Sequence, residues 1–343
     1  MVKVFIITGG TGGHIFPALE VKKFLESLNF KTYLLVSLKD NIDFNINYDF
    51  KFDSAPFKGQ NFKKIFLNIF KILKGTFQSF LFTLKINPHM IFIFGSYASF
   101  PFFIPSLIMR KKIFVFEQNS IPGVVTKIFS KFSKKIFVSF KETEKFLRKK
   151  CILLSNPVRN LKLIPREKAR RILNIPLDKR TILFLGGSQG AKKLIELSYK
   201  YSEITADTIL TLAGKFYEEY KEKLKRENFY LFPFRNDMEN FYSACDVVVS
   251  RSGAGAVFEI LKIKKKAIFI PFPYAVDNHQ YYNALFAKRY GTFKILIEEK
   301  MDPFILKKEI DEIFKEKENF KELPDWRKIL KREIKSCYSS IQE

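Results

Sequence analysis

The chain has 343 residues, of which 47% are hydrophobic and 28% charged, so it can bury more than one core and we expect two domains. Its net charge of +25 indicates a polyanionic partner, either nucleic acid or an anionic membrane surface. The three cysteines lie far apart without a C-x-x-C motif, which excludes a disulfide framework and a cysteine zinc site and suits a reducing cytosol.

The first predicted element is a buried strand over Val2–Thr8, and it runs into the glycine-rich sequence GGTGGH at residues 9–14. A helix is predicted from about Pro17 to Leu28, with the proline near its first turn. A glycine loop between a first strand and a first helix lets the backbone approach a ligand closely. Because the apolar run stops at Thr8, we expect no signal peptide.

Residues 61–80 show a helical period, with seven apolar side chains on one face and lysines opposite. One interpretation is a helix that packs on its own sheet. The other is a surface helix whose apolar face enters lipid headgroups while its lysines meet anionic lipid. Residues 1–150 carry +15 of the net charge, so this half of the chain is expected to meet the anionic partner.

Residues 86–109 carry no formal charge and are long enough to span a bilayer, but three prolines and a GSYAS loop favour a strand, a loop and a helix. Strands over 90–94 and 113–116 end in small or polar loops at Gly95 and Glu117. Open α/β sheets bind ligands at the carboxyl ends of such strands. Further strands at 136–138 and 152–154 lead to a linker at 160–165.

The second half repeats this architecture. A strand at 181–185 precedes the loop GGSQGA and a helix to about 201, a strand at 208–212 precedes a charged helix at 216–226, and helices at 301–315 and 326–336 close the chain. The sequence therefore predicts two Rossmann-like α/β domains facing across a cleft. We place the domains at 1–160 and 165–324, with the C-terminal helix 325–343 joining the first.

The stretch from Ser250 to Ala284 combines a short strand, a glycine turn and the start of a helix. This arrangement suits a pyrophosphate, because it gathers backbone N–H groups at a positive dipole end. Glu259 could accept hydrogen bonds from a ribose diol, and the loop at 277–280 carries groups that suit sugar hydroxyls. An ordinary βα unit with a small-residue turn remains the alternative.

Seven motifs together identify a family. GGTGGHIFPALE, GSYASFP, EQNSIPG, NPVR, GGSQGA, SRSGAGAVFE and DNHQYYNA occur in the order seen in MurG, the N-acetylglucosaminyltransferase family of peptidoglycan synthesis. The resemblance covers nearly the whole chain. It implies a GT-B fold, lipid I bound by the N-terminal domain, UDP-GlcNAc bound by the C-terminal domain, and inversion at the anomeric carbon without a cofactor or required metal. The charge of +15 on residues 1–150 and the amphipathic stretch at 62–80 further predict peripheral attachment to an anionic membrane, at the cytoplasmic face of the inner membrane.

The resemblance also implies roles for individual residues. His14 is the first candidate general base and Glu117 the second, and Gly95, Ser96 and Tyr97 form the acceptor loop. Ser96 replaces a usual glycine, Phe116 replaces a frequent histidine, and Thr126 stands where asparagine is common. The positions that match donor contacts are Thr11, Gly12, Gly13, Asn119, Arg159, Ser188, Arg235, Ala254, Gly255, Ala256, Val257, Phe258, Glu259 and Gln280.

The residue chemistry is consistent with this function. No D-x-D pair is present to hold a metal, so N–H groups at helix starts, with Ser188 and Arg159, would stabilise the leaving diphosphate. Other GT-B enzymes, such as a UDP-sugar 2-epimerase or a diacylglycerol glycosyltransferase, are competing interpretations. A basic protein that binds nucleic acid without catalysis is a third, but no nucleic-acid-binding signature coincides with the charge, and we expect no nucleic-acid partner.

Overall fold

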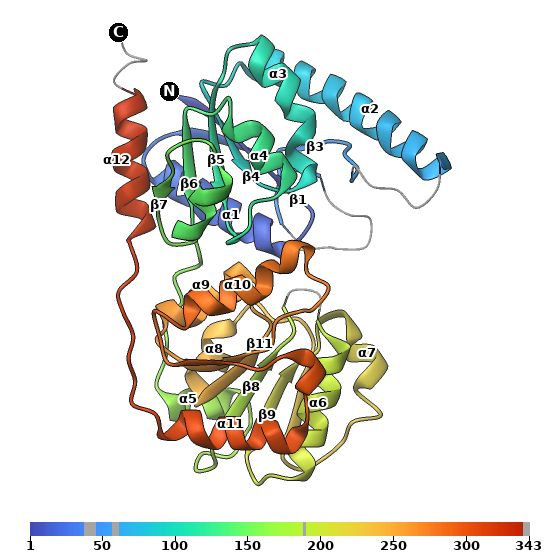
Figure 1. Ribbon diagram of the computed structural model, residues 1–343, viewed down its shortest axis with the longest axis vertical. Helices are drawn as coiled ribbons and strands as arrows, with labels where there is room; N and C mark the ends of the chain where they lie inside the picture. The colour runs from blue at the N-terminus through green and yellow to red at the C-terminus, as the bar shows by residue number, and fades with distance from the viewer. Residues whose placement is uncertain (38–45, 57–61, 188–189, 339–343) are drawn as a thin grey trace. The chain divides into compact units, whose positions relative to one another are not determined.

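The computed structural model describes residues 1–343 except 38–45, 57–61, 188–189 and 339–343. The chain divides into two compact units. Unit 1 contains Met1–Arg159 together with Pro324–Glu343, and unit 2 contains Asn160–Leu323. Each unit is a parallel sheet covered by helices (Figure 1), which confirms the predicted α/β class with two Rossmann-like folds.

The sheet of unit 1 has the strand order β3-β2-β1-β4-β5-β6-β7. All its described pairings are parallel, and its central strands are continuous apolar runs because both faces are covered. The strand order reverses between β1 and β4, and such a switch point is where open α/β sheets bind ligands. The strands are β1 (Lys3–Gly9), β2 (Lys31–Ser37), β3 (Phe50–Lys51), β4 (Met90–Phe94), β5 (Lys112–Glu117), β6 (Lys135–Val138) and β7 (Ile152–Leu153).

The helices of unit 1 come from both ends of the chain. The C-terminal helix α12 presents Trp326, Leu330 and Ile334 to a core that it shares with β1, β4 and β5. Phenylalanine rings stack across neighbouring strands of this core, as with Phe94 and Phe116 at 4.6 Å between centroids. The helices are α1 (Gly12–Ser27), α2 (Phe62–Ile86), η1 (Tyr97–Phe102), α3 (Phe103–Ile108), α4 (Val124–Ser130), η2 (Lys141–Phe146) and α12 (Trp326–Tyr338).

Helix α1 begins earlier than predicted. Gly10 has a φ of +82° and Thr11 is extended, so the chain turns and helix starts at Gly12 rather than near Pro17. The sequence Gly-Gly-His therefore forms the first turn of the helix. Pro17 lies in the second turn, where its missing N–H would have reached the carbonyl of Gly13.

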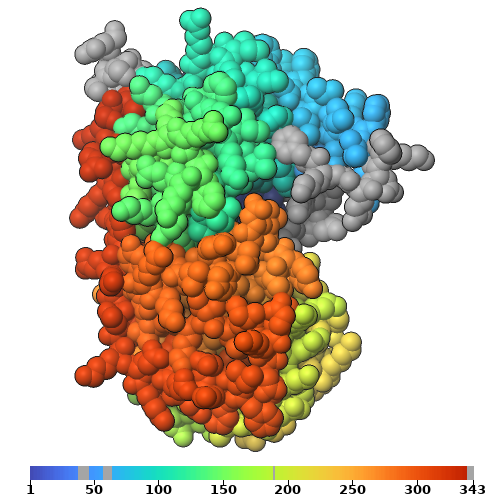
Figure 2. All heavy atoms as spheres, in the orientation of Figure 1, coloured from blue at the N-terminus to red at the C-terminus, as the bar shows by residue number. Residues whose placement is uncertain are grey.

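Helix α2 packs against the rest of unit 1 through a row of small residues. Gly75, Ser79 and Thr83 are buried, and the Ser79 hydroxyl donates to the carbonyl of Pro101 at 2.7 Å. The opposite, apolar face is open: Phe66 is 73% exposed and Phe70 60%. The interpretation of a helix that buries this face against its own sheet is therefore wrong. Figure 2 shows the α2 side chains, in light blue, at the outer surface of unit 1.

The length and composition of Lys64–Ile86 would allow this part of α2 to cross a membrane, and only 11% of its most apolar window is buried. The neighbouring segment 86–109 does not form a span. It forms β4, η1 and α3, so the prediction of a strand, a loop and a helix is confirmed.

Unit 2 holds a six-stranded sheet in the order β10-β9-β8-β11-β12-β13. Its strands are β8 (Thr181–Leu185), β9 (Thr208–Leu212), β10 (Phe229–Phe232), β11 (Val247–Ser250), β12 (Lys266–Phe269) and β13 (Phe293–Ile295). Its helices are α5 (Arg166–Ile172), α6 (Lys192–Glu203), η3 (Gly214–Phe216), α7 (Tyr217–Tyr220), α8 (Met238–Ala244), α9 (Ala254–Lys262), η4 (Val276–Asn278), α10 (His279–Ala287), η5 (Glu298–Lys300) and α11 (Pro303–Lys315).

The prediction of a charged helix at 216–226 is mostly wrong. Only Tyr217–Tyr220 is α-helical, and within α7 only Tyr220 is buried. Of residues 221–226 only Leu224 is partly buried, and one apolar contact is too little to hold a longer helix in place.

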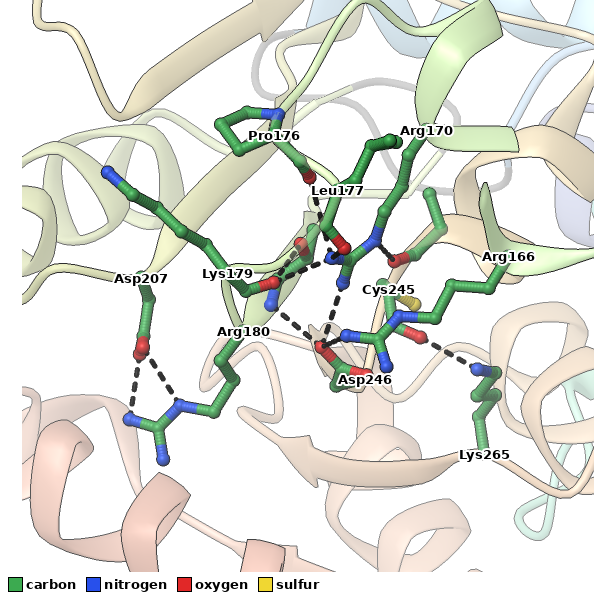
Figure 3. A network of polar contacts seen from close by, with 12 residues as sticks. Arg166, Arg170, Pro176, Leu177, Lys179, Arg180, Asp207, Cys245, Asp246 and Lys265 are labelled. Carbon is green, nitrogen blue, oxygen red and sulfur yellow. Dashed lines mark hydrogen bonds and ion pairs between the residues drawn. The ribbon is translucent and has the colours of Figure 1, made fainter. Parts of the chain in front are cut away.

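A buried arginine fastens the amino ends of the central strands of unit 2 (Figure 3). Arg170 on α5 is fully buried and donates to the carbonyls of Ala244, Leu177 and Lys179 at 2.6–3.1 Å. It also pairs with Asp246 at 3.1 Å, and Asp246 accepts from the backbone N–H of Thr181 at 2.8 Å. The network ties α5 to the starts of β8 and β11, so the opposite, carboxyl ends of these strands are built on a fixed base.

Candidate functional site

Three loops of unit 1 meet at the carboxyl ends of β1, β4 and β5. A Cβ added to Gly95 would lie 3.1 Å from Cε1 of His14, and one added to Gly10 would lie 2.9 Å from Oγ of Ser96. The first glycine loop and the second loop are therefore in direct contact. Larger side chains at these glycines would push the loops apart.

His14 lies in the first turn of α1 and is half-buried. Its Nδ1 is 2.9 Å from Oε1 of Gln118, which is buried after β5. An amide oxygen can only accept, so Nδ1 carries the hydrogen and Nε2 is left with a lone pair. The contact gives the imidazole the tautomer that a general base needs.

Glu117 has a different environment. It is 3% exposed, Oε1 accepts from the N–H of Asn119 at 3.0 Å, and Oε2 accepts from Thr126 Oγ1 at 2.5 Å and from the N–H of Gly123 at 3.3 Å. Donors inside the protein thus occupy both oxygens. The geometry favours a role in holding the loop that carries Asn119 over a role as a second base.

Ser96 adopts φ +60° and ψ 143°, a region that favours glycine. Its hydroxyl accepts from the N–H of Ala98 at 3.3 Å. Ser96 thus caps the start of η1, which contains Tyr97. The strained backbone explains why glycine is usual at this position. Serine keeps the same turn at a cost of about 1–3 kcal/mol in strain.

The first turn of α1 is the predicted N-terminal part of the donor site. Thr11 precedes the helix in an extended conformation, Gly12 is buried and Gly13 is exposed. Helices leave their first N–H groups without acceptors inside the helix, so this turn can bind an anion. Arg159 is half-buried at the end of the unit.

In unit 2, the turn after β11 leads into α9 through Gly253, which is extended. No atom lies within 4 Å of a Cβ built on Gly253 or Gly255, so the space beside the turn is open. The N–H groups of Ala254, Gly255 and Ala256 belong to the first turn of α9, whereas Val257 and Phe258 are buried in the core. The turn thus offers backbone donors and the apolar residues anchor it.

Glu259 and Gln280 are both half-buried and already oriented. Oε2 of Glu259 accepts from the Tyr242 hydroxyl at 3.1 Å. Oε1 of Gln280 accepts from the N–H of Phe272 at 3.0 Å, and its carbonyl accepts from the Ser252 hydroxyl at 2.8 Å. Gln280 is therefore linked to the turn before α9.

Arg235 makes a two-pronged contact with Asp237 at 2.8 and 2.6 Å. The hydrogen bonds from Arg235 lower the pKa of Asp237 to about 2, against the effect of burial. The arginine side chain is thus held by this carboxylate at the end of β10. Ser188 lies outside the described residues, and the flanking Gly187 and Gly190 have positive φ angles.

Within the part of the chain that the structure describes, no group of three or more His, Cys, Asp and Glu side chains could hold a metal ion. Sequence reasoning missed Gln118 and Tyr242, which contact His14 and Glu259, and it also missed Arg251 and Glu298, which pair with each other. Arg251 could have been noticed, since it is a charged residue inside an otherwise small and apolar motif.

The chain matches two domain families and several full-length relatives. Residues 4–138 match the glycosyltransferase family 28 N-terminal domain and residues 181–335 the C-terminal domain. The chain is 36% identical over 319 residues to the UDP-N-acetylglucosamine–N-acetylmuramyl-(pentapeptide) pyrophosphoryl-undecaprenol N-acetylglucosamine transferase of Sulfurihydrogenibium sp. (strain YO3AOP1), covering 92% of this chain and 90% of that protein. It is 34% identical to the transferase of the same name from Aquifex aeolicus, covering 92% of each.

Solved structures agree on the fold. The crystal structure of Acinetobacter baumannii MurG superimposes with a TM-score of 0.70 at 26% identity, covering 91% of both chains. The UDP-GlcNAc 2-epimerase of Methanocaldococcus jannaschii superimposes with a TM-score of 0.66 over 98% of this chain and 100% of that one, but at 13% identity it shows the GT-B fold alone.

Proposed function

Because the chain belongs to the MurG transferases of glycosyltransferase family 28, we propose that it moves N-acetylglucosamine from UDP-GlcNAc to the muramyl 4-hydroxyl of lipid I, which gives lipid II. The observation that carries this proposal is the 36% identity over 92% of the chain, which spans both units. Relatives of this kind also support a cytoplasmic enzyme. The epimerase alternative has only the fold in its favour.

Unit 1 would bind the acceptor through the loops at His14 and Ser96, and unit 2 the donor through the turn before α9. The acceptor oxygen forms a bond to the anomeric carbon while the bond from that carbon to the diphosphate breaks, with inversion. Nε2 of His14 takes the hydroxyl proton, and UDP leaves with the electron pair. N–H groups at the start of α9, assisted by Arg159 and Ser188, would stabilise its charge.

The function is tested by incubating the full chain with labelled UDP-GlcNAc and a lipid I analogue. We expect label in a lipid-linked disaccharide, and turnover that continues in EDTA. Formation of UDP-N-acetylmannosamine without an acceptor would instead identify an epimerase. Loss of turnover in EDTA with rescue by magnesium or manganese would overturn the metal-free mechanism.

We also propose that unit 1 attaches peripherally to the anionic cytoplasmic face of the inner membrane through α2 and its neighbour α3. The apolar face of α2 is exposed along the helix, and Ile104 and Ile108 extend the apolar surface on α3. Exposed lysines on the same helix add roughly 1 kcal/mol each near anionic lipid. The exposed apolar residues of α2 are Ile65, Phe66, Leu67, Ile69, Phe70, Leu73, Phe77, Leu81 and Leu84.

Vesicle co-sedimentation at low and high salt tests this attachment. High ionic strength screens the attraction between lysines and anionic lipid, whereas phenylalanines inserted in the bilayer stay bound. We therefore expect part of the protein to remain on the vesicles at high salt. Changing Lys63, Lys64, Lys71 and Lys74 together to glutamine should remove the salt-sensitive part, and Phe66→Ser with Phe70→Ser the salt-resistant part. No binding of the wild type to anionic vesicles at low salt would refute the proposal.

A further inference from the structure

Glu298 in η5 lies outside every motif of the sequence, yet it touches two of the segments that surround the donor turn. Its side chain is buried, with 6% of the residue exposed. Oε1 accepts from Nζ of Lys193 at 2.8 Å, and Oε2 pairs with the guanidinium of Arg251. Lys193 is the second residue of α6, the helix that follows the sequence GGSQGA, and Arg251 is the first residue after β11.

Arg251 carries the connection to a third segment. It is 6% exposed, and its second terminal nitrogen donates to the carbonyls of Ile270 and Pro271 at 3.1 and 3.2 Å, directly after β12. Its guanidinium also lies 5.4 Å from the ring centre of Phe272. One arginine therefore fixes the turn before α9 against the loop after β12.

The loop after β12 in turn orients Gln280. The N–H of Phe272 donates to Oε1 of Gln280, and the Ser252 hydroxyl donates to the Gln280 carbonyl. Asn283 adds a further link to the turn before α9, because its side-chain amide donates to the carbonyl of Ser252 at 3.1 Å. If Arg251 lost these contacts, both the turn before α9 and Gln280, the predicted sugar contact, would be held less firmly.

We propose that Glu298, acting through Arg251 and Lys193, is a positioning residue that fixes the start of α6, the turn after β11 and the loop after β12 for binding a nucleoside diphosphate sugar. The proposal rests on the proposed function in taking UDP-GlcNAc as that sugar. Its carboxylate contacts Lys193 near the start of α6 and Arg251 in the turn before α9.

The network is built to stay charged. Burial raises the pKa of Glu298, but the hydrogen bonds from Lys193 and Arg251 outweigh burial and hold its pKa below the ordinary value. Buried ion pairs add little stability compared with apolar packing, and their best-attested use is to select one arrangement. Here the selected arrangement is the relative placement of α6, the turn after β11 and the loop after β12.

The test uses Glu298→Gln in the full chain, which keeps the shape of the side chain and removes its charge. We expect the Kd for UDP and the KM for UDP-GlcNAc to rise about tenfold, with the KM for the lipid I analogue unchanged. Lys193→Met should raise both donor constants about two- to threefold, because this lysine is largely exposed. Lys307→Met, which removes an ion pair within α11, is the matched control and should change neither.

A purely structural role would lower the melting temperature and leave the donor constants as they are, and that result would overturn the proposal. Lys193→Met keeps the test decisive if Glu298→Gln fails to fold, since a donor KM equal to that of the control also refutes it. Backbone amide exchange in the absence of UDP provides a second readout, and we expect Glu298→Gln to exchange faster at 251–253 and 272–280. If the wild type binds no UDP, the proposed function fails, while unchanged exchange would refute the network itself.

Discussion

His14 is the residue that we propose as the general base of unit 1. Its Nδ1 faces Oε1 of Gln118, so Nε2 is the atom that can take a proton. We expect His14→Ala to lower kcat by about 10²–10⁴-fold while the Kd for UDP changes little. The acid limb of the kcat–pH profile, which reports protonation of the base, should disappear with it.

The control for this prediction is a histidine with a structural contact. His89 accepts from the backbone N–H of Lys3 at 3.1 Å, and His89→Ala should leave kcat and its pH profile unchanged. Gln118→Leu should lower kcat less than His14→Ala and shift the acid limb, because it removes only the acceptor that selects the tautomer. An acid limb that survives in His14→Ala would assign the proton to another group.

Glu259 gives a second prediction at this scale. If its carboxylate holds the ribose diol, Glu259→Ala should weaken UDP binding about tenfold or more, since hydrogen bonds to a charged group contribute about 1.5–3 kcal/mol. Tyr242→Phe removes the hydroxyl that orients Oε2 and should weaken binding less. Calorimetry with UDP measures both, and an unchanged Kd for Glu259→Ala would refute the ribose role.

The sequence yields candidate site residues, but it does not yield the partners that hold them. His14 stands out because it closes a glycine loop between a strand and a helix. Gln118, its partner, is 104 residues away, and only the pairing of β1 with β4 and of β4 with β5 brings the two together. The second candidate base, Glu117, is buried beside Thr126, and this burial depends on packing that no local pattern records.

At the scale of elements, α2 shows that a helical period alone does not determine which face of a helix is buried. An apolar stripe normally faces the core. In α2 the buried stripe is instead Gly75, Ser79 and Thr83, spaced by four residues. The close backbone approach at Gly75 and the hydroxyl contact of Ser79 hold the helix, and these depend on tertiary structure.

This packing predicts opposite effects for two glycine-to-alanine changes. A Cβ on Gly75 would lie 1.8 Å from the carbonyl oxygen of Asp53, so Gly75→Ala should destabilise unit 1 by about 1–3 kcal/mol. Gly255 in α9 has nothing within 4 Å, so Gly255→Ala should be neutral or stabilise unit 2 by up to about 1 kcal/mol. Chemical denaturation measures both, and equal effects at the two glycines would contradict the packing of α2.

At the scale of the whole molecule, unit 1 is assembled from both ends of the chain. Helix α12 buries Trp326, Leu330 and Ile334 in the core of unit 1, and Glu333 pairs with Lys135 of β6. Unit 2, by contrast, is a continuous segment. We therefore predict that residues 160–323 fold alone and bind UDP, whereas residues 1–159 need the helix 324–343 to fold.

Circular dichroism and thermal melting of the two fragments check this prediction, with a synthetic 324–343 peptide added to the first. The peptide should restore a cooperative transition, and a Leu330→Ala peptide should restore it less well, because truncating a buried leucine costs about 2–5 kcal/mol. Cooperative melting of 1–159 without the peptide would show that α12 is dispensable. The α/β pattern of both halves and the joining of the last helix to the first domain are predicted from the sequence, but the strands that this helix covers are not.

Because α12 follows unit 2 in the chain, it is synthesised after that unit on the ribosome. At about 5–20 residues per second, the stretch between the end of the first segment and the last helix takes on the order of 10–40 s to synthesise. Throughout that interval the phenylalanine-rich strands of the first segment lack the helix that covers one side of them, while the second unit can complete its fold. The nascent chain should therefore depend on chaperones at its N-terminal half, and the first half translated should be the last to become protease-resistant.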